Sequence, residues 1–294
     1  MIRWTFILLV LFYIPVVNAQ TGLTSNPDNN TLLWEISGNG LSSPSYIFGT
    51  FHLVCKDDLS FSTAVKQAII NSKEVYLELD MDDPATMLGA LTLLNMQGDK
   101  KLKDLYKPED YKKIADFFKD SLNMYIAMFQ RMKPGFLSAM LYPKMLGCKN
   151  SVSVEDGIMR IAKANDKEIK GLETMAMQAA VFDSIPYEKQ AAELMNAIDS
   201  LETSKMHFQL LLTSYKKQQI DEIEKMIMTP EFGIELDQDI LLDNRNKNWV
   251  SQLRTIMKTN PVFIAVGAGH LVGKNGLISL LRTEGYVVRG LENR

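Results

Sequence analysis

The sequence predicts an α/β protein whose central mixed sheet is built from strands at both ends of the chain, with a large helical insertion between them. Short runs rich in strand-forming residues occur between positions 32 and 81 and again after Pro261. From about 84 to 250, apolar residues recur every three or four positions over long stretches, which is the helical period. Strands and helices alternate in both terminal regions, as is typical of an α/β sheet.

The first strands follow directly from the order of residues. Residues 32–37 and 46–51 are apolar, and the segment between them is rich in Gly, Ser and Asn, so we expect a hairpin. Residues 62–72 carry apolar side chains at helical spacing. Residues 75–81 alternate in polarity, which predicts a strand with Glu78 on the face opposite the apolar one.

The rest of the chain completes the sheet. Within the helical region, residues 168–172 predict one short strand. After Pro261, residues 262–266 predict a strand, 277–283 a helix and 286–289 a further strand. We therefore expect a single domain that carries the helical region as an insertion.

The first 19 residues predict a secretory signal. Arg3 is followed by an apolar run at 4–17, and small residues before Ala19 suit cleavage after that position. The domain would then cover residues 20–294, in a secreted or periplasmic protein with no membrane segment after cleavage. Its first residues, 21–30, are polar and predict a flexible start.

Charge and cysteine content limit the partners and the compartment. The formal net charge is -3, which argues against nucleic acid as a partner and gives no indication of oligomeric state. Cys55 and Cys148 are the two cysteines of the chain. In an oxidising compartment they would form a disulfide, the alternative being two buried free thiols.

Two of the three histidines occur in the same local pattern. Gly49 precedes His52 by three residues, and Gly267 precedes His270 by three, each pair at the end of a predicted strand. A glycine lets the backbone turn tightly or approach a ligand. An imidazole at the carboxyl end of a strand can face the crevice in which open α/β sheets bind ligands.

Glu78 is the third candidate of this site. A carboxylate in a strand suited to burial needs a partner or a metal. Together with His52 and His270 it could hold a divalent metal that leaves positions open for water. Glu78 could equally remain unligated and act as a general base, or simply line a solvated strand face.

Weaker candidates lie elsewhere in the sequence. Glu173 follows the short predicted strand, where it could bind substrate or only favour a helix N-terminus. Arg245 and Asn246 fall on a predicted helix, where an arginine could bind a substrate carboxylate or form a surface salt bridge. Glu155 is explained as a first-turn acid of a helix, and His207 as a structural residue of a long helix.

These motifs together resemble the TraB/GumN/PrgY family, which includes the Tiki metalloproteases. The resemblance runs in order through the mature chain, from the segment that ends at His52, through the Glu78 strand, Gly171-Leu-Glu-Thr and Arg245-Asn246, to the segment that ends at His270. It implies that His52, Glu78 and His270 are active-site residues that hold a divalent metal such as Mn, Co or Zn. It also implies hydrolysis of a peptide or protein substrate.

A non-catalytic peptide-binding protein is the alternative. The TraB and PrgY members are associated with limiting peptide-pheromone signalling, which sequestration achieves without cleavage. Such a protein would need the pocket but not the metal, so the metal content of the purified protein separates the two hypotheses.

Overall fold

Six strands form one mixed sheet in the order β6-β4-β7-β2-β1-β8. The computed structural model describes residues 23–26, 29–84, 93–229 and 237–293. Strands β6, β4, β7 and β2 run parallel to one another, whereas β1 is antiparallel to both β2 and β8. The strands are β1 (Leu33–Gly38), β2 (Ser45–Thr50), β4 (Glu74–Leu79), β6 (Glu168–Glu173), β7 (Val262–Gly267) and β8 (Tyr286–Gly290).

The predicted fold class is confirmed, and both ends of the chain contribute strands. The hairpin of β1 and β2 pairs Leu33 with Phe48. The C-terminal strand β7 lies between the N-terminal strands β2 and β4. Its first five residues are all buried, as expected for a central parallel strand covered on both faces. The sheet therefore forms only when residues more than 200 positions apart pair.

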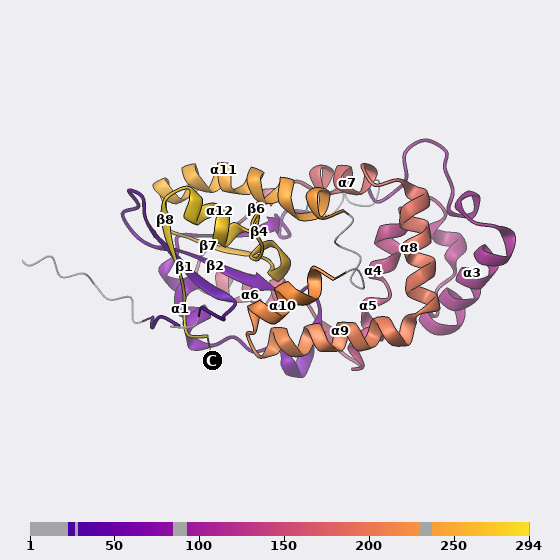
Figure 1. Cartoon of the computed structure of the whole chain (residues 1–294), viewed down its shortest axis with the longest axis horizontal. Helices are drawn as coiled ribbons and strands as arrows, with labels where there is room; N and C mark the ends of the chain where they lie inside the picture. Colours follow the sequence, from indigo (N-terminus) through magenta and orange to yellow (C-terminus); the bar gives the residue numbers. More distant parts are fainter. Residues whose placement is uncertain (1–22, 27–28, 85–92, 230–236, 294) are drawn as a thin grey trace, which may run out of the picture.

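Helices cover both faces of the sheet (Figure 1). Helix α1 begins after Ser62, whose hydroxyl accepts a hydrogen bond from the Val65 amide at 3.1 Å, and it buries Val65, Ala68 and Ile69 as the sequence predicts. In the view of Figure 1, α11 and α12 lie above the sheet and α1 and α6 below it. These helices are α1 (Thr63–Asn71), α6 (Val154–Ala164), α11 (Asn244–Thr259) and α12 (Leu277–Thr283).

Most of the remaining helices extend away from the sheet, toward the right of Figure 1, whereas α10 packs against the core around the sheet through Ile220, Ile223 and Ile227. Several of them enclose a second apolar cluster that is separate from the core around the sheet. Phe208 packs against both clusters and so joins the two parts. These elements are η2 (Leu102–Leu105), α3 (Pro108–Leu122), η3 (Ile126–Phe129), α4 (Pro134–Ala139), α5 (Tyr142–Leu146), α7 (Met175–Asp183), α8 (Tyr187–Asp199), α9 (Leu201–Lys216), α10 (Ile220–Ile227) and the π-helix η6 (Asp239–Asp243).

The structure divides the predicted insertion at one point. Strand β6, expected as a short interruption, is an edge strand of the main sheet, and α6 packs against it. The helical region therefore consists of one segment before α6 and a second after β6. That the whole forms a single domain stays a prediction.

A disulfide joins Cys55 to Cys148, with the Cα atoms 6.0 Å apart, as predicted. Cys55 belongs to a small antiparallel pair, β3 (Val54–Cys55) with β5 (Ser151–Val152), and Cys148 precedes β5. The bridge thus fixes the loop that follows His52 against the segment that leads into α6.

The beginning of the described chain is paired. Ser25 forms an antiparallel bridge with Leu291, and the Thr24 hydroxyl donates to Glu292 at 2.8 Å, so the prediction of a flexible start is wrong for these residues. The predicted signal segment, residues 1–19, lies outside the described residues. Within the described parts, no helix combines the length and the apolar character needed to cross a bilayer.

Candidate active site

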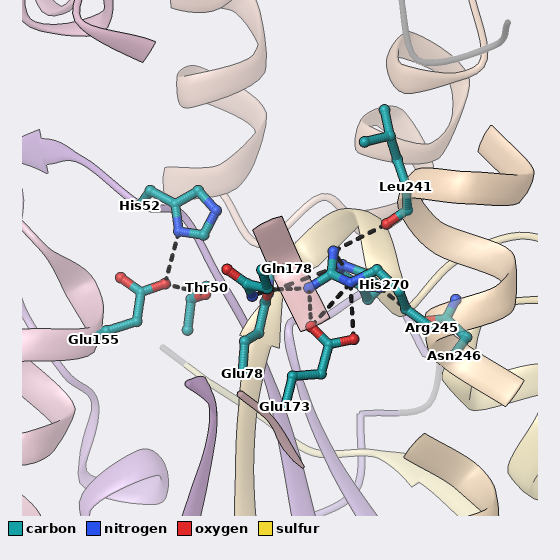
Figure 2. Close-up of polar contacts among 11 residues, drawn as sticks. Thr50, His52, Glu78, Glu155, Glu173, Gln178, Leu241, Arg245, Asn246 and His270 are labelled. Carbon is teal, nitrogen blue, oxygen red and sulfur yellow. Dashed lines mark hydrogen bonds and ion pairs between the residues drawn. The ribbon is translucent and has the colours of Figure 1, made fainter. Parts of the chain in front are cut away.

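The carboxyl ends of four neighbouring parallel strands bring the candidate residues to one edge of the sheet. Glu173 ends β6, Glu78 lies near the end of β4, and His270 follows β7 in the short helix η7 (Ala268–His270). His52 follows β2, the next strand across the sheet. Figure 2 shows Glu78 between the His52 side chain and the group around His270.

The two glycine–histidine motifs leave adjacent strands because β2 and β7 pair in parallel, with Thr50 opposite Gly267. A Cβ at Gly49 would lie 3.0 Å from the Leu271 side chain and 3.2 Å from Ala268. Glycine therefore lets the turn that carries His270 pack closely on β2. The backbone amide of Gly267 donates to Glu78 Oε1 at 2.9 Å. Gly49 thus allows the close approach of the two turns, and the Gly267 amide contacts the Glu78 carboxylate.

Glu78 is held by a cation and by neutral donors. Its Oε2 accepts from Arg245 Nη2 at 2.7 Å and from Gln178 at 3.3 Å, and its Oε1 lies 3.9 Å from His270 Nε2. Burial raises the pKa of the Glu78 carboxyl, but the electrostatic effects of His270, Arg245 and His52, together with the Gly267 amide, outweigh burial and lower this pKa to about 2. Glu78 is therefore ionised at neutral pH.

Arg245, in the first turn of α11, uses every nitrogen of its guanidinium within the site. Nε and Nη2 contact the Glu173 carboxylate at 2.9–3.2 Å, and Nη2 also reaches Glu78. Nη1 contacts the Leu241 carbonyl at 3.0 Å and His270 Nε2 at 3.1 Å. All five N–H groups of the fork are engaged by these acceptors. Arg245 and Glu173 satisfy each other, and their roles in substrate binding stay predictions.

His270 is buried and its tautomer is fixed by Asn246. The distance from Nδ1 to Asn246 Oδ1 is 2.7 Å, and the Asn246 amide donates to the Asn275 carbonyl at 2.9 Å. Because the amide oxygen can only accept, His270 carries its proton on Nδ1 and its lone pair on Nε2, facing Arg245. Burial lowers the pKa of His270 to about 3, and Trp249 packs against the ring at 4.4 Å. Asn246 is buried and orients His270, and its role in substrate binding stays a prediction.

His52 has a different partner. Its Nδ1 lies 3.1 Å from Glu155 Oε1, which also accepts from the Thr50 hydroxyl at 2.7 Å. The hydrogen bond to Glu155 raises the pKa of His52 to about 9, and the charge of Glu78 contributes in the same direction. The His52 side chain is 67 % exposed and that of Glu155 only 11 %. A buried carboxylate thus holds an exposed, cationic imidazole whose Nε2 stays available.

The residues do not fit one metal ion as they are placed. Among the described residues, no group of three or more His, Cys, Asp or Glu side chains lies close enough to hold a metal. Glu78 and His270 do come together, but Arg245 occupies the lone pair of His270 and His52 turns to Glu155. A metal shared by His52, Glu78 and His270 therefore stays a prediction that requires rearrangement.

Sequence reasoning missed the partner of His52 and the support of His270. Glu155 follows Ser153, whose hydroxyl caps α6 by accepting from the Asp156 amide and also donates to the Glu155 carboxylate. This local explanation hid the contact with His52, 103 positions away. The Asn275 carbonyl accepts from Asn246, and the Asn275 side chain donates to Asp243 at 2.6 Å. Apart from its position in a glycine-rich turn, no sequence pattern indicates this role of Asn275.

Fold and site define an α/β protein with two histidines and a glutamate at the carboxyl edge of a parallel sheet. The family model described as TraB/PrgY/gumN matches residues 32–290, and the chain belongs to this family. It is similar to the metalloprotease TIKI1 of Danio rerio, with 23% identity over an alignment of 321 positions. This alignment covers 90% of this chain and 64% of the relative.

Two further relatives carry similar names. The metalloprotease TIKI2 of Xenopus tropicalis is 23% identical over 94% of this chain and 62% of its own length. The metalloprotease TIKI1 of Homo sapiens is 24% identical over 88% of this chain and 61% of its own length. The chain therefore spans less than two thirds of the length of these relatives. No solved structure matches the chain.

Proposed function

We propose that this chain is an exported hydrolase of peptide or protein substrates whose reactive groups are His52, Glu78 and His270. The proposal depends on one observation, the meeting of an ionised carboxylate, an exposed cationic imidazole and a buried neutral imidazole at one sheet edge. The metalloprotease names of the relatives support the same reaction class.

His52 and Glu78 would act on the substrate directly. Glu155 engages Nδ1 of His52, so the Nε2–H group is the one that can donate to a peptide carbonyl oxygen. Glu78 Oε1 accepts from the Gly267 amide and, as a carboxylate oxygen, can accept one further hydrogen bond from water. Arg245 would keep Glu78 ionised and oriented, and His270 would help to position Arg245.

The reaction needs one water molecule per peptide bond. The water oxygen attacks the carbonyl carbon while one of its protons passes to Glu78. His52 Nε2–H donates to the oxygen on which negative charge develops. The carbon–nitrogen bond then breaks, and the proton on Glu78 passes to the leaving nitrogen. The products are a carboxylic acid and an amine.

A metal-dependent form of the reaction, with Mn, Co or Zn as the predicted ion, is the finer version of this proposal. It would require His52 to leave Glu155 and Arg245 to leave His270, because the three predicted ligands do not converge among the described residues. The steps above assign no role to a metal.

Peptide cleavage tests the proposal. The mature protein is incubated with a degenerate peptide mixture, with a chelator or with added Mn²⁺, and new peptide ends are identified by mass spectrometry. Glu78→Gln and His52→Gln should each abolish cleavage, whereas His207→Ala, a substitution on α9, should not. Cleavage that persists in Glu78→Gln would refute the assigned role of Glu78.

A non-catalytic peptide-binding protein is the second candidate. The saturation of Arg245 by Glu173, Leu241, Glu78 and His270 favours it, because this network is complete without metal or substrate. A protein that retains peptides from the mixture and returns them uncut under every metal condition would establish this alternative.

A further inference from the structure

The buried guanidinium of Arg245 lies where three potential metal ligands face one another. Two of them are the carboxylates of Glu78 and Glu173, whose side chains are only 15% and 3% exposed. The third is the Nε2 lone pair of His270, fixed by the hydrogen bond from Nδ1 to Asn246. Two carboxylates and an imidazole are a donor set that divalent transition metals accept.

A cation is required at this position. Negative charge on two carboxylates buried side by side is unfavourable unless a compensating positive charge lies beside them. Arg245 supplies that charge, with 2.7 Å from Nη2 to Glu78 and 2.9 Å from Nη2 to Glu173. The same guanidinium donates to the imidazole lone pair at 3.1 Å. One side chain thus satisfies all three groups.

The planar fork also keeps the three groups apart. The three acceptors bind to different nitrogens of the guanidinium, each at a hydrogen-bond distance of 2.7–3.2 Å, so they do not surround a single atom. A single ion needs ligands at about 2.0–2.2 Å from one centre. Among the described residues no three such side chains form a group that could hold a metal, and the Arg245 guanidinium lies between these three.

We propose that Arg245 is the resident cation of this site, and that Glu78, Glu173 and His270 bind a divalent metal only when the guanidinium is removed. This metal site differs from the one predicted from the sequence, because it includes Glu173 and excludes His52. The inference concerns the charge held by the site and does not depend on peptide hydrolysis.

The experiment compares the wild-type chain with Arg245→Ala by thermal unfolding and by equilibrium dialysis against Mn²⁺, Co²⁺ and Zn²⁺. In wild type we expect no metal binding that requires Glu173 or His270, and a chelator should leave the Tm unchanged. Arg245→Ala should lower Tm by roughly 5 to 9 °C in the presence of chelator, since two buried carboxylates lose their partner. Metal at about 100 times its Kd should restore roughly 5 °C.

Two further variants keep the result decisive. The double variant Arg245→Ala with Glu173→Gln should lose the metal response, which separates this site from adventitious binding. Arg245→Lys retains one charge without the fork and should fold with an intermediate Tm, which provides a test if the alanine variant does not fold. The proposal would be overturned if the wild-type chain bound stoichiometric metal that His270→Ala did not bind. It would also be overturned if Arg245→Ala folded but bound none of the three metals.

Discussion

Replacing Glu155 by glutamine should return the pKa of His52 to its ordinary range. The hydrogen bond to Glu155 is the largest cause of the rise from 6.5 to about 9, and the Glu155 charge acts in the same direction. Without that carboxylate, Glu78 still raises the pKa of the exposed His52 side chain and Arg245 lowers it, so we expect a value near the ordinary 6.5. At pH 8 the protonated fraction of His52 should fall from about 90% to about 3%.

Histidine-selective NMR measures this change directly, because the chain has three histidines. The side-chain nitrogen signals of His52 are followed from pH 5 to pH 10 in wild type and in Glu155→Gln. Thr50→Val is the matched control, since it removes the neutral donor at 2.7 Å from Glu155 but keeps the carboxylate. In that variant the pKa of His52 should remain well above 6.5. A pKa near 9 in Glu155→Gln would refute the assignment of Glu155 as the cause.

Three further predictions follow from the same contacts. Peptide cleavage should decline as pH rises through about 9, because His52 must be protonated to donate; a rate that increases over that range would instead indicate a neutral, metal-ligating imidazole. Since the pKa of Glu78 is about 2 in the folded chain and about 4.3 when unfolded, wild type should lose about 3 kcal/mol more stability than Glu78→Gln as pH falls from 5 to 2, measured by urea unfolding. Replacing Cys55 and Cys148 together by serine should lower Tm by up to about 8 °C, because their bridge closes a loop of 93 residues, and an unchanged Tm would show that it adds no stability.

Local sequence alone determined the elements that form the sheet. The polarity alternation around Glu78 predicted β4, and the apolar run after Pro261 predicted β7. The prediction for α12, residues 277–283, matches its observed bounds. These elements can be predicted because the direction of the side chains repeats about every two residues in a strand and about every 3.6 residues in a helix. Residues close together in the sequence therefore show which face of the element is buried.

The repeated motif also predicted which residues share an edge. Gly49 and His52 mirror Gly267 and His270, and the structure places the two motifs at the ends of paired parallel strands. What the motif could not supply was the direction of each side chain. His270 turns inward to Asn246, whereas His52 turns outward against Glu155.

Only the tertiary structure decided the partners of the charged groups. Arg245 meets Glu173 across 72 positions and Glu78 across 167, and the sequence gives no local pattern for either contact. These pairings depend on how α11 docks over the carboxyl ends of β4 and β6, which is set by packing of the whole core. Local sequence patterns therefore identified the residues of the site. The pairing of its charges depends on the tertiary structure, because a buried carboxylate requires a cation and that cation comes from a distant part of the chain.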